Sequence, residues 1–280
     1  MIRSLARSKA RAIPRPLALP FVRGGGAVLD PDTAAFRDAS GATQLSGIDA
    51  IAKYMRAEGL RNNYRLYPKK SAQNAGSGST VFGIGGLTAN NMTLANSPTW
   101  GSSGIAFNTT NQFAHISDFL DAETITVICR RSGTLGAGGT WMFGQWDFAA
   151  NHRSFGLLAS GSTISAGVIN RSSDGGSTNS ESYATPSGYL QTADASYVTQ
   201  WTAGGGRSAW GNKILQSLSL TSGTAQTNRF NSAASIMLNA VGTPASAAGF
   251  MGGTYTAFCV VRGTLTTTQR ETLTDLVNAL

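Results

Sequence analysis

The C-terminal segment of this 280-residue chain, residues 249–280, constrains its fold most strongly. A strand-like run, Thr254–Val261, is followed by a helix start signal in which Thr266 and Gln269 fit a capping box, each side chain bonding to the backbone of the other residue. The following apolar residues have the spacing of one buried helical stripe: Leu273, Leu276, Val277 and Leu280. The chain therefore ends in an amphipathic helix, which we expect to pack on the sheet that contains this run.

The run 254–261 is apolar on both of its faces. The residues of one face are Tyr255, Ala257, Cys259 and Val261, and those of the other are Thr256, Phe258 and Val260. A strand that is apolar on both faces is covered on both faces. We predict a central strand with one face inside a two-sheet sandwich and the other under the terminal helix.

The chain as a whole has the composition of short strands and turns. It contains 34 glycines and only 13% charged residues, which leaves little material for long helices. With 41% apolar residues the chain can bury a substantial core. Its turn-separated apolar runs predict a mostly β fold, an antiparallel β-sandwich that occupies residues 64–280.

Residues 1–29 form a basic segment that cannot build a core of its own. Pro14, Pro16 and Pro20 favour an extended course without internal hydrogen bonds. No acidic residue occurs among the first 23 residues, so this segment supplies most of the net charge of +8. We expect an extended docking arm that becomes ordered on another protein chain. The basic residues of this arm are Arg3, Arg7, Lys9, Arg11, Arg15 and Arg23.

Residues 30–63 are predicted to form a small helical or mixed connector. Its apolar residues at helical spacing, expected to pack in a core, are Ile48, Ile51, Ala52 and Met55. Asp30, Asp32 and Asp38 lack the interleaved ligands and closing glutamate of a calcium-binding loop. These three carboxylates are therefore expected in turns and helix caps.

The order of patterns within residues 64–280 is distinctive. A turn at Asn74–Gly78 is followed by the strand-like runs Asn91–Leu94, Gly104–Phe107, Ala122–Arg130, Trp141–Trp146 and Tyr197–Thr202. This order resembles that of the concanavalin A-like lectin and glucanase jelly rolls, in particular their laminin-G-like branch. The resemblance implies an antiparallel jelly roll, and it bears on fold more strongly than on function.

Catalytic residues are not evident. Glucanases of this superfold use an E-x-D-x-x-E pattern for acid and nucleophile chemistry, and this sequence has none. The acids Asp118, Asp121 and Glu123 cluster before a strand, where turn and cap roles are expected. His115 and His152 lie far apart, and the sequence around them assembles no nucleophile, base and orienting acid. We predict that the protein is not an enzyme.

No cofactor is expected. Cys129 and Cys259 lie in strand-like runs without further ligands at zinc spacing, which favours buried free thiols. A disulfide between them requires neighbouring strands. Calcium held in edge loops is an alternative that the lectin-like resemblance implies, with no ligand spacing to select among its candidates: Asp118, Asp121, Asp147, Asn151 and Asp174.

Aromatic residues supply the remaining binding signal, because aromatic faces stack on the apolar patches of sugar rings. Trp141 and Trp201 lie inside strand runs and are expected in the core. Trp210 lies in the glycine-rich stretch GGGRSAWGN, so we predict that it is exposed. With Tyr183 and Tyr189, at the loop 172–188, it forms the candidate glycan-binding set.

Three functional hypotheses follow. The first is a non-enzymatic virion structural protein of a tailed bacteriophage, as a capsid decoration, fibre or tail-associated protein. Its arm would bind other virion proteins, and by analogy it would form a homo-oligomer, a trimer. The alternative is a carbohydrate-binding adhesin that contacts a host surface glycan; a glycoside hydrolase or lyase of the same superfold ranks lowest. No apolar run reaches the roughly 18 residues needed to span a bilayer.

Overall fold

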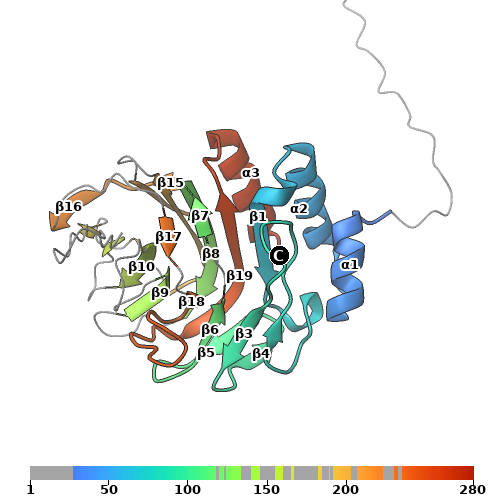
Figure 1. Cartoon of the computed structure of the whole chain (residues 1–280), viewed down its shortest axis with the longest axis horizontal. Coiled ribbons are helices and arrows are strands. Elements are labelled where there is room, and N and C mark those ends of the chain that lie inside the picture. Colours follow the sequence, from blue (N-terminus) through green and yellow to red (C-terminus); the bar gives the residue numbers. More distant parts are fainter. Residues whose placement is uncertain are drawn as a thin grey trace, which may run out of the picture.

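The computed structural model describes most of the chain as two packed antiparallel sheets with helices on one outer face (Figure 1). The described residues are 28–117, 120–122, 124–133, 140–145, 155–159, 165–166, 182–184, 189, 192–202, 207–222, 230–232 and 235–280. The predicted docking arm lies outside this part, so its role stays a prediction. Among the described residues, no helix combines the length and apolar character of a membrane span.

The first sheet has, within the described residues, the strand order β15-β14-β13-β8-β19-β5-β4, and β1 also pairs with β19. Its strands are β1 (Tyr64–Pro68), β4 (Thr99–Gly101), β5 (Gly104–Phe107), β8 (Thr124–Ser132), β13 (Ala195–Thr202), β14 (Arg207–Gly211), β15 (Ile214–Leu215) and β19 (Gly253–Arg262). The long strands β8 and β19 pair in the middle of this sheet. The terminal β run is therefore central, as predicted.

The second sheet has the order β10-β9-β18-β6-β3-β2 over the described residues. Its strands are β2 (Thr80–Val81), β3 (Met92–Ala95), β6 (Phe113–Ile116), β9 (Thr140–Gln145), β10 (Phe155–Ala159) and β18 (Ile236–Leu238). Short strands form two minor sheets: β11 (Ser165–Ala166), β12 (Ser182–Ala184) and β16 (Ser219–Ser222), then β7 (Leu120–Ala122) and β17 (Phe230–Ser232). The predicted class, a mostly β antiparallel sandwich, is confirmed.

One core fills the space between the two large sheets. Phe143 of β9 contacts Trp201 of β13 and Phe258 of β19, with ring centroids 6.2 Å and 5.6 Å away. Such aromatic pairs add to the stabilisation that burial of their apolar area provides. Trp141 and Trp201 are both buried, as their positions in strand runs predict.

A second core lies between the outer face of the first sheet and the helices (Figure 1). The helical elements of the described residues are α1 (Pro31–Ser40), α2 (Ser46–Ala57), the 3-10 turns η1 (Arg61–Asn63) and η2 (Ser71–Gln73), and α3 (Thr267–Asn278). The predicted core residues of the connector are buried here: Ile48, Ile51, Ala52 and Met55. The helical character of residues 30–63 is therefore confirmed, and its helices share a core with the terminal helix.

The start of each outer helix follows from its sequence. The Thr266 hydroxyl accepts a bond from the Gln269 amide at 3.2 Å, while the Gln269 side chain accepts one from the Thr266 amide at 3.0 Å, confirming the capping box of α3. Asp30 caps α1 by accepting from the Asp32 amide at 2.9 Å. A hydrogen bond from Arg56 holds the pKa of Asp30 below its usual value. The predicted cap role of Asp30 is confirmed.

A β-bulge in β19 corrects one expectation about its faces. The pairing with β8 shifts between Tyr255 and Ala257, which leaves Thr256 as the extra residue. Tyr255 consequently faces the inter-sheet core together with Phe258, whereas Cys259 faces the helices. The predicted alternation is wrong at Tyr255 because a bulge reverses the side-chain phase.

The two cysteines lie on neighbouring strands but on opposite faces of the first sheet. Cys129 is opposite Phe258 in the register of β8 and β19, so Cys259 is displaced from it by one residue. A displacement of one residue turns a side chain to the other face. Both cysteines are buried free thiols, as favoured by the sequence.

Candidate functional site

Trp210, the predicted exposed tryptophan, is buried, with 7% of its surface accessible. It lies within β14, opposite Val198 of β13, and faces the helix-side core. The Arg270 guanidinium of α3 covers its ring at 4.1 Å from the centroid. The prediction of exposure is therefore wrong, because the glycine-rich stretch contains a strand that the terminal helix covers.

Tyr189 does not form an exposed surface with Trp210. Tyr189 is buried in the inter-sheet core, where its ring centroid lies 5.5 Å from that of Tyr197. Its hydroxyl donates to the Trp210 carbonyl at 3.2 Å, and burial raises its pKa. Tyr183 belongs to β12, and its side chain lies outside the described part of the structure.

The predicted structural role of His115 agrees with its position. It lies half-buried on β6, and burial lowers its pKa. Among the described residues, no group of three His, Cys, Asp or Glu side chains could hold a metal ion. The other side chains considered for catalysis or calcium lie outside the described part: Asp118, Asp121, Glu123, Asp147, Asn151, His152 and Asp174.

A different tryptophan, Trp100, lines a hollow at the rim of the sandwich, which we call the edge pocket. The pocket has a volume of about 430 Å³ and lies where edge strand β4 of the first sheet approaches β2 of the second. It is lined by Gly78, Ser79, Leu94, Asn96, Ser97, Pro98 and Trp100. It therefore combines an aromatic ring with hydroxyl and amide groups.

Trp100 is held firmly in this pocket. Its indole nitrogen donates to the Gly78 carbonyl at 3.0 Å, which joins the edges of the two sheets. The ring is partly buried and packs against the inter-sheet core. One part of the indole is thus fixed by the protein while another part remains accessible.

The turn beside Trp100 has an unusual backbone. Asn96 and Ser97 both have positive φ angles, 59° and 54°, which cost about 1–3 kcal/mol each for residues other than glycine. The Gln112 side chain fixes the turn by donating to both carbonyls, at 3.1 Å and 2.9 Å. The side-chain nitrogen of Asn96 donates to the Asn111 carbonyl at 2.7 Å. Such strain persists where the surrounding structure maintains it, as at ligand sites.

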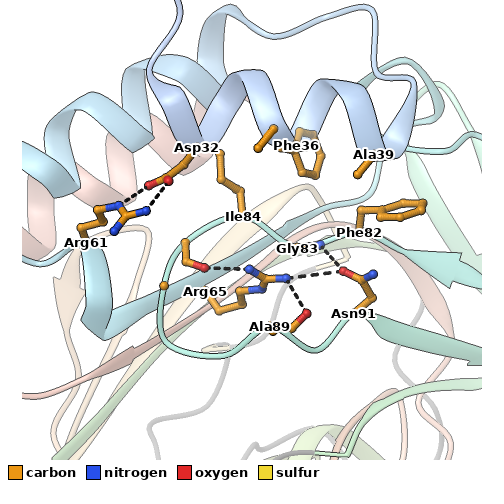
Figure 2. A pocket seen from close by; sticks show the side chains of 13 residues that line it. Asp32, Phe36, Ala39, Arg61, Arg65, Phe82, Gly83, Ile84, Ala89 and Asn91 are labelled. Atoms are coloured by element: carbon orange, nitrogen blue, oxygen red, sulfur yellow. Dashed lines mark hydrogen bonds and ion pairs between the residues drawn. The ribbon is translucent and has the colours of Figure 1, made fainter.

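A second hollow, the helix-side pocket, lies between α1 and the loop 82–91 (Figure 2). Its volume is about 300 Å³. Apolar lining comes from Ala35, Phe36, Ala39, Phe82 and Ile84, and polar lining from Asp32, Arg61, Arg65 and Asn91. Arg61 binds the Asp32 carboxylate with two bonds, of 2.8 Å and 2.7 Å.

Arg65 shapes the loop of this pocket. It has 9% of its surface accessible, and it donates to the carbonyls of Gly85 at 2.7 Å and Ala89 at 3.3 Å (Figure 2). A Cβ atom on Gly83 would lie 2.5 Å from the Arg65 Nε, so only glycine allows the loop to approach. The loop conformation is therefore built around one buried guanidinium.

No family model matches this chain, and no curated protein matches it. Among solved structures, Trypanosoma rangeli sialidase in complex with 2,3-difluorosialic acid matches with TM-score 0.52 and 11% identity, covering 81% of this chain and 38% of the sialidase. What this match shows is the fold, a mostly β antiparallel sandwich of two sheets with helices at both ends of the described chain. The same sialidase with the inhibitor DANA matches with TM-score 0.52 and 12% identity, covering 83% of this chain and 39% of the sialidase.

A carbohydrate-binding module, the Ruminococcus gnavus IT-sialidase CBM40 bound to α2,3-sialyllactose, has TM-score 0.42 and 14% identity. That match covers 57% of this sandwich chain and 83% of the module. The sandwich spans about two-fifths of the first sialidase chain. At such identities the sialidase matches show the fold alone.

Proposed function

We propose that this chain is a non-catalytic carbohydrate-binding module whose sugar site is the edge pocket. The observation that carries the proposal is Trp100, an indole fixed beside a strained polar turn at the rim of the sandwich. A fixed aromatic face stacks on the apolar face of a sugar ring. The sequence alone does not single out Trp100, because its position depends on the bond to Gly78, 22 residues earlier in the chain.

The polar groups of the pocket suit sugar hydroxyls. The Ser79 and Ser97 hydroxyls make no hydrogen bond among the described residues, and both line the edge pocket. Asn96 uses its amide nitrogen within the protein, which leaves its side-chain oxygen as an acceptor. Because Gln112 already holds the turn, binding a sugar would order few groups, which reduces the entropic cost of association.

The absence of catalysis is part of this proposal. It is supported by the missing E-x-D-x-x-E pattern, since glycoside hydrolysis in this superfold needs paired carboxylates. None of the described residues that line the edge pocket is a carboxylic acid. The pocket can therefore bind a sugar through stacking and hydrogen bonds without supplying a general acid.

Replacement of Trp100 by alanine tests this function. We expect the wild-type protein to bind at least one glycan on an array, and Trp100→Ala to weaken that binding about tenfold or more, because the stacking surface is lost. Trp100→Phe is the matched control and should retain most of the binding. Absence of glycan binding by the wild type, or equal binding by Trp100→Ala, would contradict the proposal.

Display of this module on the virion of a tailed bacteriophage is a further part of the proposed function, motivated by the basic segment 1–29. Deletion of residues 1–23 is expected to abolish incorporation into particles, since it removes all six basic residues of the arm. The remaining sandwich should keep its melting temperature. Full incorporation of the shortened protein would contradict docking through the arm.

A further inference from the structure

We propose that the helix-side pocket is a second ligand site, which takes a small carboxylate with an apolar body. The described residues that line it are all different from those that line the edge pocket. The two sites are therefore separable by mutation, and this inference does not depend on sugar binding.

The hydrogen-bonding groups of the pocket favour a ligand that accepts hydrogen bonds rather than one that donates them. The carbonyls of Gly85 and Ala89 already accept bonds from Arg65. The Asn91 side-chain oxygen accepts from the Gly83 amide at 3.1 Å and from Arg65 at 3.4 Å. These acceptors are engaged by the protein. A ligand rich in hydrogen-bond donors would therefore find few of them available.

Donors, in contrast, remain available. The Asn91 side-chain nitrogen makes no bond among the described residues. Arg61 Nη1 has one long contact, 3.5 Å to the Asn62 side chain. Arg65 Nε also has no partner among the described residues, but it is buried against Gly83 and out of reach of a ligand, so the accessible donors are those of Asn91 and Arg61. Unused donors at a hollow match the oxygens of a carboxylate.

The charged groups around the pocket also favour an anionic ligand. Asp30 and Asp32 are both paired, Asp30 with Arg56 and Asp32 with Arg56 and Arg61. Arg65 has only neutral acceptors and no ion pair with a described carboxylate. Of the two guanidinium groups that line the pocket, Arg61 is paired with Asp32, and Arg65 has no carboxylate partner among the described residues. A buried charge without a counter-ion is unfavourable, and a bound anion would supply one.

The opposite wall of the pocket determines which apolar group the anionic ligand has. Phe36 and Ala39 of α1, together with Phe82 and Ile84 of the loop, present apolar surface above Arg65 (Figure 2). A cavity of about 300 Å³ is at the small end of ligand pockets. Carboxylate oxygens would meet the donors, and an aromatic or branched aliphatic body would lie against this wall.

The test uses three probes that separate charge from apolar contact: 3-phenylpropionate, its neutral analogue 3-phenylpropan-1-ol, and acetate. Each is titrated into the full-length protein while the backbone amide NMR signals of Gly83, Gly85 and Gly86 are followed. We expect 3-phenylpropionate to shift these signals to saturation, with at least about tenfold tighter binding than either other probe. Equal affinity of the acid and the alcohol, or no shift of these signals, would overturn the proposal.

Asn91→Asp tests the site itself. The aspartate keeps the oxygen that accepts from Gly83 and Arg65, but it removes the free donor and adds a negative charge. We expect it to weaken 3-phenylpropionate binding about tenfold or more without lowering the melting temperature. Gln216→Glu, with the same charge change near edge strand β15, should bind as the wild type does. Unchanged affinity in Asn91→Asp would contradict the assignment.

Discussion

Leu273→Asp is expected to destabilise the protein by about 4 kcal/mol or more, because it buries a carboxylate without a partner. Leu273 is fully buried between α3 and the first sheet, in the core that also contains Ile51 and Cys259. The substitution removes the apolar contact of α3 and adds a desolvated charge. Urea denaturation followed by circular dichroism measures the loss as a lower midpoint.

Thr268→Asp is the matched control on the same helix. Thr268 is exposed in the first turn of α3, where the helix dipole favours a negative charge. Its free energy of unfolding should stay within about 0.5 kcal/mol of the wild-type value. An unchanged midpoint for Leu273→Asp would mean that α3 is not an integral layer of the fold.

Lys69→Met is expected to stabilise the protein at pH 7 by about 3–5 kcal/mol, because it removes a buried amine that must lose its proton on folding. Lys69 is fully buried. Its nitrogen contacts the Met92 sulfur at 3.1 Å and the Tyr67 ring at 5.7 Å, and it has no ion pair with a described carboxylate. Burial lowers its pKa from 10.5 to about 7. Methionine has a similar volume and needs no hydrogen bond.

The direction in which stability changes with pH tests the contribution of Lys69. Between pH 7 and 8.5 the folded lysine loses its proton while the unfolded lysine keeps it, so wild-type stability should rise with a slope that approaches about 1.4 kcal/mol per pH unit. Lys69→Met should lack this rise, whereas Lys53→Met, at a half-exposed position, should retain it. Above this range the two buried cysteines lower the stability as pH rises. Burial raises the pKa of both thiols to about 12, so they stay protonated in the folded protein while the unfolded thiols lose their protons. Equal pH slopes in wild type and Lys69→Met would contradict the account.

The helices and the central strand could be predicted from the sequence because their signals are local. Thr266 and Gln269 are three residues apart, and the buried residues of α2 repeat at helical spacing. The strand 254–261 is apolar on both faces, which requires a cover on each side. These patterns depend on neighbours along the chain, so they need no knowledge of how the strands pair.

The candidate site could not be predicted, because it depends on contacts between distant segments. Trp210 is covered by Arg270, sixty residues further along the chain, and Trp100 is fixed by the Gly78 carbonyl of the other sheet edge. The extra residue at Thr256 has no signature in the apolar pattern. Exposure of a tryptophan is decided by which element lies over it, and the local sequence does not contain that information.

The most direct test of the proposed function follows the indole N–H signals of the five tryptophans by NMR as the glycan selected on the array is added. The signals of Trp100 and Trp210 are assigned from their absence in Trp100→Phe and Trp210→Phe. We predict that the Trp100 signal shifts in proportion to occupancy while the Trp210 signal, covered by Arg270, does not. A shift of Trp210 with an unchanged Trp100 signal would contradict sugar binding at the edge pocket.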